Sequence, residues 1–292
     1  MKRNITSLFL AVVLLVAIAA PAQAIIVRDQ RVPLAGSFTL LALGDGVSAG
    51  AGLADGSADS DFVSLSASAL NMSPVNHAID GLTSDGLLAM LAEPDDALAG
   101  DLACAAVVCV SIGGNDLLDL VYAIVGEALS LEPGDISGVQ GKLAEMWEAG
   151  DSAGQQALQL NALLALPKWT GAAAERLAAN LVGVVEAIRE YNPEATIVAL
   201  TLYNPYIGVE ELSMLTTVMD TVLDIFNGII YAGESECLIA DVGAFFKGSD
   251  KPLTNAADGS EAFNPLPNAD GHALIAEIVA ELVNVAALAE MD

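Results

Sequence analysis

The sequence predicts an α/β domain in which a parallel sheet of five strands lies between two layers of helices. Three observations support this fold. Short apolar runs alternate with longer segments of helical periodicity along the chain. Glycines follow three of the apolar runs, as is typical at the ends of buried parallel strands. Strands that alternate with helices form βαβ units, and such units build a three-layer sandwich around a parallel sheet.

The five strands are expected at the apolar runs, which occupy residues 38–43, 75–79, 105–112, 195–202 and 238–242. The first run ends at Gly44, the second ends near Gly81, and the third is followed by Gly113. Because parallel strands end at one edge of their sheet, the loops after these three strands should lie together there. Ligands of such sheets bind at that edge.

Helices are expected between the strands, over residues 59–70, 84–93, 171–191, 209–231 and 270–289. The dipeptide Asn192-Pro193 ends the third of these. Residues 117–165 are rich in alanine and leucine and punctuated by glycine, which predicts an insertion of several short helices. The apolar stretch 117–131 within it is interpreted as a core helix, with the wall of an acyl pocket as the alternative.

The N-terminus has the pattern of a secretory signal peptide. Lys2 and Arg3 precede an apolar run at residues 8–20, and an A-x-A site follows at residues 22–24. The apolar run is too short to span a bilayer comfortably. We expect residues 1–24 to be cleaved and residues 25–292 to form one domain. The protein should then be secreted or otherwise extracytoplasmic, without stable membrane insertion.

The net charge of the chain limits the classes of partner that it is expected to bind. It has 38 acidic residues against 10 lysines and arginines, a formal net charge of −28. Such a surface repels phosphate backbones and anionic membranes, so nucleic acid is not an expected partner. The acidic residues are scattered, as on a surface that keeps a protein soluble. No ligand spacing of a known metal loop occurs, and we expect no cofactor.

Four segments at the ends of predicted elements carry a recognisable set of motifs. They are LGDGVSAG at 43–50, NHAIDGLTS at 76–84, SIGGND at 111–116 and NPLPNADGH at 264–272. In order and spacing they resemble the four sequence blocks of the SGNH/GDSL hydrolase family, and the resemblance covers residues 38 to about 285. It implies the flavodoxin-like SGNH hydrolase fold, and an ancestry among serine hydrolases of esters, lipids or acetylated sugars.

The resemblance also assigns an oxyanion hole. In the family, backbone N–H groups at the nucleophile and at the glycine of the second block combine with the asparagine of the third block. These positions fall on Gly46, Gly81 and Asn115, and all three are suited to the role. Asp45 is expected to fix the first loop by accepting backbone N–H bonds.

The catalytic triad of the family is absent at the corresponding positions. The serine position falls on Gly46, the histidine position on Leu266, and the aspartate position on Phe263 or Asn264. Glycine cannot attack a carbonyl and leucine cannot accept a proton. Loss of serine or histidine from a subtilisin-type triad costs on the order of a millionfold in kcat. The resemblance thus implies an esterase-like protein that binds an acyl ester or glycan without the usual hydrolysis.

Two other functions stay open at this stage. The chain could be an active ester hydrolase that uses rearranged residues, with Ser48 as nucleophile and His272 as base. It could instead be an extracellular structural or interaction protein in which the pocket is unused. A divalent cation held by oxygen atoms of Asp45, Asp80, Asp116 and Asn115 is a third alternative for the site.

Four neighbouring polar residues are given structural roles. His77, the other histidine besides His272, is interpreted as a satisfied residue of the second strand. Ser84 is expected to cap the helix that starts there. Ser111 is interpreted as a core hydroxyl, and Asp116 as a local hydrogen-bond acceptor in its turn.

Overall fold

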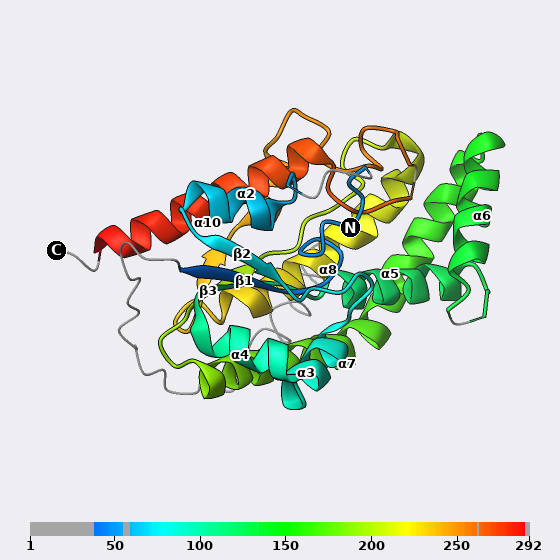
Figure 1. Ribbon diagram of the computed structural model, residues 1–292. Helices are drawn as coiled ribbons and strands as arrows, with labels where there is room; N and C mark the ends of the chain where they lie inside the picture. Colours follow the sequence, from blue (N-terminus) through cyan, green and yellow to red (C-terminus); the bar gives the residue numbers. More distant parts are fainter. Residues whose placement is uncertain (1–37, 55–58, 133, 262, 290–292) are drawn as a thin grey trace.

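The computed structural model describes residues 38–54, 59–132, 134–261 and 263–289 (Figure 1). The predicted signal peptide lies outside these residues. A parallel sheet of five strands forms the centre, with helices on both of its faces. The predicted α/β class and three-layer arrangement are therefore confirmed.

The strands are β1 (Thr39–Gly44), β2 (Ser73–Asn76), β3 (Ala105–Ser111), β4 (Thr196–Leu200) and β5 (Leu238–Ala240). All neighbours are parallel, in the order β2-β1-β3-β4-β5. This is the flavodoxin-like order, in which the chain reverses direction across the sheet between β1 and β3. The loops after these two strands therefore flank the point where ligands bind in such sheets.

The second strand starts and ends earlier than predicted. It covers Ser73–Asn76 rather than residues 75–79, and it includes Pro74. Proline has no N–H to donate, and β2 tolerates it because it is an edge strand with a partner on one side. Beyond the strand, His77 and Ile79 still donate their N–H groups to the carbonyls of Ala42 and Gly44. These bonds hold the second loop against β1.

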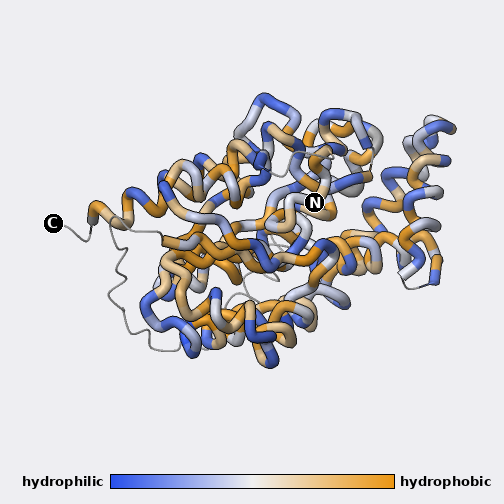
Figure 2. Tube along the Cα trace, viewed as in Figure 1, coloured by the Kyte–Doolittle hydropathy of each residue, from blue (hydrophilic) through white to orange (hydrophobic). Residues whose placement is uncertain are grey.

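Alternate side chains of β1 enter different cores. Leu40 and Ala42 are fully buried under α2 (Phe62–Ala69) and α10 (Ala269–Ala289). Leu41 and Leu43 are fully buried on the opposite face. That face is covered by α3 (Ser84–Ala92), α4 (Asp96–Cys104) and the C-terminal part of α7. Figure 2 shows the resulting apolar band through the sheet, with hydrophilic residues toward the outer helices.

The segment predicted as an insertion of several short helices is organised differently. It contains α5 (Gly114–Ala128), α6 (Ile136–Glu148) and the start of α7 (Ser152–Tyr191), a continuous helix of 40 residues. The number of helices was overestimated because only some of the glycines interrupt a helix. Gly134 lies between α5 and α6 and Gly150 between α6 and α7, both with positive φ, whereas Gly141 lies inside α6. In Figure 1, α6 and the first half of α7 extend beyond the end of the sheet.

Helix α5 is a core helix, as the first interpretation of residues 117–131 predicts. Val121, Ile124 and Val125 are fully buried. They pack with residues of α7 and of α8 (Ser213–Tyr231), which follows a short 3-10 turn at Glu210–Leu212. Two short helices, α4 and α9 (Val242–Lys247), were not predicted; each begins after an aspartate that accepts an N–H bond at its first turn.

Helix α10 is long and apolar enough to cross a membrane by length and composition alone, over Ala269–Leu288. Here it packs against α2 and the sheet, with Ile275 and Val279 fully buried. A core helix passes the same length test, and we interpret α10 as one. It begins at Ala269, within the last of the four motifs, and so helps to position it.

Candidate functional site

The first and third loops meet at the reversal point of the sheet. The N–H of Asp45 donates to the carbonyl of Ser111 at 2.9 Å, and the Ser111 hydroxyl donates to the Asp45 carboxylate at 3.0 Å. Gly44 makes this approach feasible, because a Cβ on it would collide with the Ser111 carbonyl and its φ is +117°. The sequence thus brings the end of β3 directly onto the turn that carries Gly46.

Asp45 supports the first loop from below, as predicted. It is 3% exposed, and its carboxylate accepts the N–H of Val47 at 3.2 Å in addition to the Ser111 hydroxyl. Burial raises the pKa of Asp45 to about 7, although these donors and the Gly114 N–H favour the charged form. Near neutral pH this carboxyl therefore changes its charge underneath the loop.

The second loop carries Asp80 and Gly81 at the exposed edge of the site. The N–H of Ile79 donates to the Gly44 carbonyl at 2.9 Å, which ties this loop to the first. Gly81 has a φ of +78°, and among the described residues no atom other than those of its chain neighbours lies within 4 Å of where its Cβ would be. There is consequently open space beside the glycine assigned to the oxyanion hole.

The third loop is joined to the second by Asn115. Its side-chain amide donates to the carbonyl of Leu82 at 2.9 Å, and the residue is half-buried in the first turn of α5. The three loops that carry Gly46, Gly81 and Asn115 are therefore linked by direct hydrogen bonds. An amide nitrogen has two hydrogens, so the bond to Leu82 leaves one of them for a ligand.

The last motif brings Leu266 against Gly46. A Cβ added to Gly46 would lie 3.0 Å from Leu266 Cδ2. Leu266 also covers Gly52 and holds its place through its own backbone, which accepts from the Asn255 N–H at 3.0 Å. The two positions that the resemblance assigns to nucleophile and base are thus side by side, and neither residue has a group for acid–base chemistry.

The residues at the aspartate position serve the loop itself. Asn264 Oδ1 accepts the N–H of Leu266 at 2.9 Å, and its amide donates to Glu261 at 3.0 Å. Phe263 packs with the core around α5 and α8, and its carbonyl accepts from the Tyr206 hydroxyl at 3.3 Å. Neither side chain supplies the acid that would orient a histidine at position 266.

Three further side chains hold this loop, and the sequence did not single them out. The Tyr203 hydroxyl donates to the Pro265 carbonyl at 2.9 Å, directly before Leu266. The Thr254 hydroxyl donates to the Pro205 carbonyl at 2.6 Å. Asn268 Oδ1 accepts the Gly271 N–H at 3.0 Å and so caps α10. The capping role of Asn268 could have been predicted, because a polar residue directly before a predicted helix is a typical N-cap.

Comparison with solved structures agrees with this architecture, although comparison of the sequence finds no match. No model of a protein family matches the sequence, and no curated protein matches it either. Among solved structures, the lipase Lip_vut3 from a goat rumen metagenome matches with a TM-score of 0.55 and 21% identity. The match covers 85% of this chain and 97% of the lipase.

Two further solved structures match in the same way. Phospholipase A1 from Streptomyces albidoflavus NA297 has a TM-score of 0.54 and 18% identity over 86% of this chain and 99% of its own. A putative GDSL-like lipase from Parabacteroides merdae ATCC 43184 has a TM-score of 0.52 and 14% identity over 87% and 99%. The chain has the SGNH hydrolase fold. At these identities, the likeness establishes the fold and leaves the chemistry to the residues of the site.

Within the SGNH fold, His272 lies in the core rather than in the site. It is fully buried between α10 and α2, where it stacks on Phe62 and its Nδ1 accepts the Phe62 N–H at 3.3 Å. Burial lowers the pKa of His272 to about 4, despite the nearby Asp61. A base must reach the proton that it removes, and this ring is enclosed between the two helices.

Ser48 is also enclosed. Its side chain is fully buried, and its hydroxyl has no hydrogen-bond partner among the described residues. Its backbone carbonyl accepts the amide of Asn76 at 2.6 Å, which fixes the turn. A nucleophile needs both a base and access to the ester, so this geometry argues against the rearranged pair of Ser48 and His272.

The remaining polar residues have structural partners, and two predictions, those for Ser84 and for Asp116, are wrong. Thr83, not Ser84, caps α3 by accepting the Gly86 N–H. Ser84 instead donates its hydroxyl to Asp116 at 2.6 Å, which bonds across to α3 rather than within its own turn. His77 lies just after β2 and contacts Asp101 at 2.7 Å.

Both carboxylate oxygens of Asp116 accept hydrogen bonds from Ser84, so Asp116 already has structural partners and is a poor candidate for a cation ligand. Among the described residues, no three His, Cys, Asp or Glu side chains gather to hold a metal ion. The alternative in which Asp45, Asp80, Asp116 and Asn115 bind a divalent cation therefore has no geometric support.

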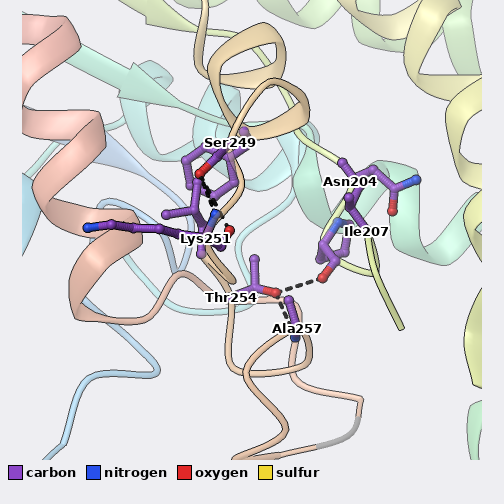
Figure 3. A pocket seen from close by; sticks show the side chains of 9 residues that line it. Asn204, Ile207, Ser249, Lys251, Thr254 and Ala257 are labelled. Atoms are coloured by element: carbon purple, nitrogen blue, oxygen red, sulfur yellow. Dashed lines mark hydrogen bonds between the residues drawn. The ribbon is translucent and has the colours of Figure 1, made fainter. Parts of the chain in front are cut away.

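A small pocket lies beside the last loop, outside the predicted oxyanion site (Figure 3). It is lined by the segment after β4, by Phe246 of α9 and by residues of the segment 249–257, among them Lys251 and Thr254. The bond from Thr254 to Pro205 crosses its wall. The pocket includes none of Gly46, Gly81, Asn115 and Leu266, and it is a separate feature of the loop.

Proposed function

We propose that this chain is a secreted protein of esterase ancestry that binds an acylated or glycan ligand at the retained oxyanion loops and does not hydrolyse it. The contact between Leu266 and the side-chain position of Gly46 carries this proposal. The nucleophile and base of the SGNH fold would have to meet at that point, and both are missing. What remains can polarise a carbonyl but cannot attack it.

The backbone supports retention of binding. Hydrogen bonds link the loops of Gly46, Gly81 and Asn115, and open space lies beside Gly81. Preorganised N–H donors at such a site recognise a carbonyl oxygen whether or not a nucleophile stands beside them. A ligand that binds only the folded chain should raise its thermal stability according to its concentration and affinity.

The test measures hydrolysis and binding together. Short-chain p-nitrophenyl esters should be hydrolysed no faster by the wild type than by its Ser48→Ala variant or by a control protein of similar composition. Non-hydrolysable acyl amides of the same length, and acetylated sugars, should raise Tm as their concentration rises. A turnover that survives repurification and disappears in Ser48→Ala would refute the proposal. Absence of any stabilisation across both ligand sets would instead favour a structural role.

A further inference from the structure

The side-chain position that Gly46 leaves empty is occupied by a carboxylate from the neighbouring loop. The nearest atom to a Cβ built on Gly46 is Asp80 Oδ1, and Leu266 Cδ2 follows at 3.0 Å. Asp80 itself is exposed and directly precedes Gly81. An acid from the second loop therefore stands where the resemblance places the serine of the first.

The Asp80 carboxylate has no partner among the residues that the structure describes. No hydrogen bond or ion pair is formed by it there, although its neighbour Ile79 is fixed to β1. The ion pairs of Lys142, Lys168, Arg176 and Lys251 lie elsewhere, on α5, α6, α7, α3 and around Lys251. Asp45 adds a second carboxyl group beneath the same loop. The site is thus anionic at its surface.

This charge has opposite effects on the two kinds of group that could enter. A carboxylate beside the N–H donors opposes the negative charge that an oxyanion would develop, which is a further obstacle to ester hydrolysis. The same carboxylate attracts an ammonium group held within a few ångströms of it. Gly46 is what lets Asp80 reach this place, because a larger residue would exclude its carboxylate.

We propose that Asp80 makes this a site for cationic ligands: molecules in which an ammonium group accompanies the acyl or hydroxyl group that the oxyanion donors bind. Asp80 is the specificity-determining residue, and its carboxylate contacts the ammonium group. This inference rests on the proposed function, since it names the ligand class of the same site. Neutral and anionic acyl ligands of equal size bind more weakly there.

The sharpest probes are two esters of the same shape. Acetylcholine carries a quaternary ammonium group, and 3,3-dimethylbutyl acetate replaces it by an uncharged tert-butyl group. Binding of each to the full chain is followed by NMR line broadening of the ligand and by the shift in Tm. We expect acetylcholine to bind about fivefold more tightly, the effect of one ion pair at about 4 Å in water. Added salt should reduce this preference.

Two variants separate the site from the overall charge. Asp80→Asn keeps the shape of the side chain and should bring the two esters to equal affinity. Asp224→Asn changes the net charge equally on the exposed surface of α8 and should leave the preference intact. Neither variant removes a hydrogen bond among the described residues, so both should fold as the wild type does.

The outcomes distinguish this inference from the function on which it rests. Equal binding of the two esters to the wild type would overturn the role of Asp80 and leave the ligand-binding proposal standing. A preference that persists in Asp80→Asn but falls in Asp224→Asn would also overturn it, since the general charge would then be responsible. Failure of both esters, of acyl amides and of acetylated sugars to bind would overturn both proposals.

Discussion

The donor side and the acid–base side of the candidate site differ in what positions them. On the donor side, backbone groups of short loops are fixed to the ends of β1 and β3, as in the bond from Asp45 to Ser111. On the acid–base side, a long loop is held by side chains such as Tyr203 and Asn268, none of which is a triad position.

This difference accounts for which half of the family pattern survives. The donors of the first two loops are backbone N–H groups, so they persist as long as the strands and turns form. The triad depends on side chains. Leu266 and Phe263 can stand at two of its positions without removing any hydrogen bond by which Tyr203 or Asn268 holds the loop. In the proposed function, the fold persists without the catalytic side chains, and five experiments, including the final labelling test, examine that separation.

The largest effect should come from restoring the triad. Gly46→Ser, Leu266→His and Phe263→Asp together should raise p-nitrophenyl ester hydrolysis by at least about 100-fold, whereas each alone should stay at background, because triad residues act as a unit. The φ of Gly46 is not positive, so serine fits its backbone. Rates are measured after circular dichroism confirms folding.

Two modifications control this rescue. Asn264→Asp replaces Phe263→Asp in a parallel series and keeps the oxygen that accepts the Leu266 N–H. Asp80→Ala, added to each series, should increase the rate further because the Asp80 carboxylate otherwise collides with the new serine. If every folded combination stays at background and resists fluorophosphonate, the loops do not hold the geometry of a former triad.

The next effect concerns the pH dependence of stability. The folded-state pKa of Asp45 is about 7, above its ordinary value of 3.8, so the unfolded chain releases this proton first as pH rises. The contribution of Asp45 to stability therefore falls between about pH 4 and pH 7, by up to about 4 kcal/mol. The difference in unfolding free energy between wild type and Asp45→Asn, from urea titrations, should fall by this amount.

His272 acts in the opposite direction over nearly the same range. Its pKa is lowered from 6.5 to about 4, so its contribution to stability is full above pH 6.5 and is lost as pH falls toward 4. The wild type should show a shallow slope from these two groups, and Asp45→Asn a rising one. A flat profile for Asp45→Asn would show that His272 is accessible to protons in the folded protein.

A smaller effect is expected at the cap of α10. Asn268→Ala removes the oxygen that accepts the Gly271 N–H and should lower the free energy of unfolding by about 1–2 kcal/mol. Asn268→Ser keeps a capping oxygen but loses the amide bonds to Pro252 and Asp258. The two variants, compared by urea unfolding, separate the cap from the loop; equal losses would show that the cap contributes nothing.

The smallest effect concerns the hydrogen bond between Tyr203 and the Pro265 carbonyl, directly before Leu266. Tyr203→Phe removes the hydroxyl that donates to the Pro265 carbonyl and should cost about 1 kcal/mol. Tyr191→Phe, at the end of α7, is the matched control and should change stability by a few tenths at most. If thermal unfolding gives the same loss for both, the loop is held by its other contacts.

The sheet and most of its helices were predictable from local patterns. Buried parallel strands such as residues 105–112 must be apolar throughout, and their ends need glycines such as Gly44 where two loops approach. The uninterrupted α7 was not predictable, because glycines and alanines specify helix ends weakly and tertiary packing decides them.

The site was predictable where a motif fixes a backbone position. The neighbours Gly46 and Leu266 come from distant motifs, and the structure places them together as the resemblance implies. The position of the Asp80 carboxylate over Gly46 could not be predicted, since it depends on how two loops pack.

We propose that the SGNH fold of this chain holds no reactive serine. Fluorophosphonate labelling of the folded wild type, followed by intact-mass and peptide mass spectrometry, tests it most directly. The folded triad-restored variant, which carries Gly46→Ser, is the positive control and should be labelled at position 46. For the wild type, we expect no stoichiometric adduct at any serine. A stoichiometric wild-type adduct at Ser48 would contradict it and establish an active enzyme with a rearranged site.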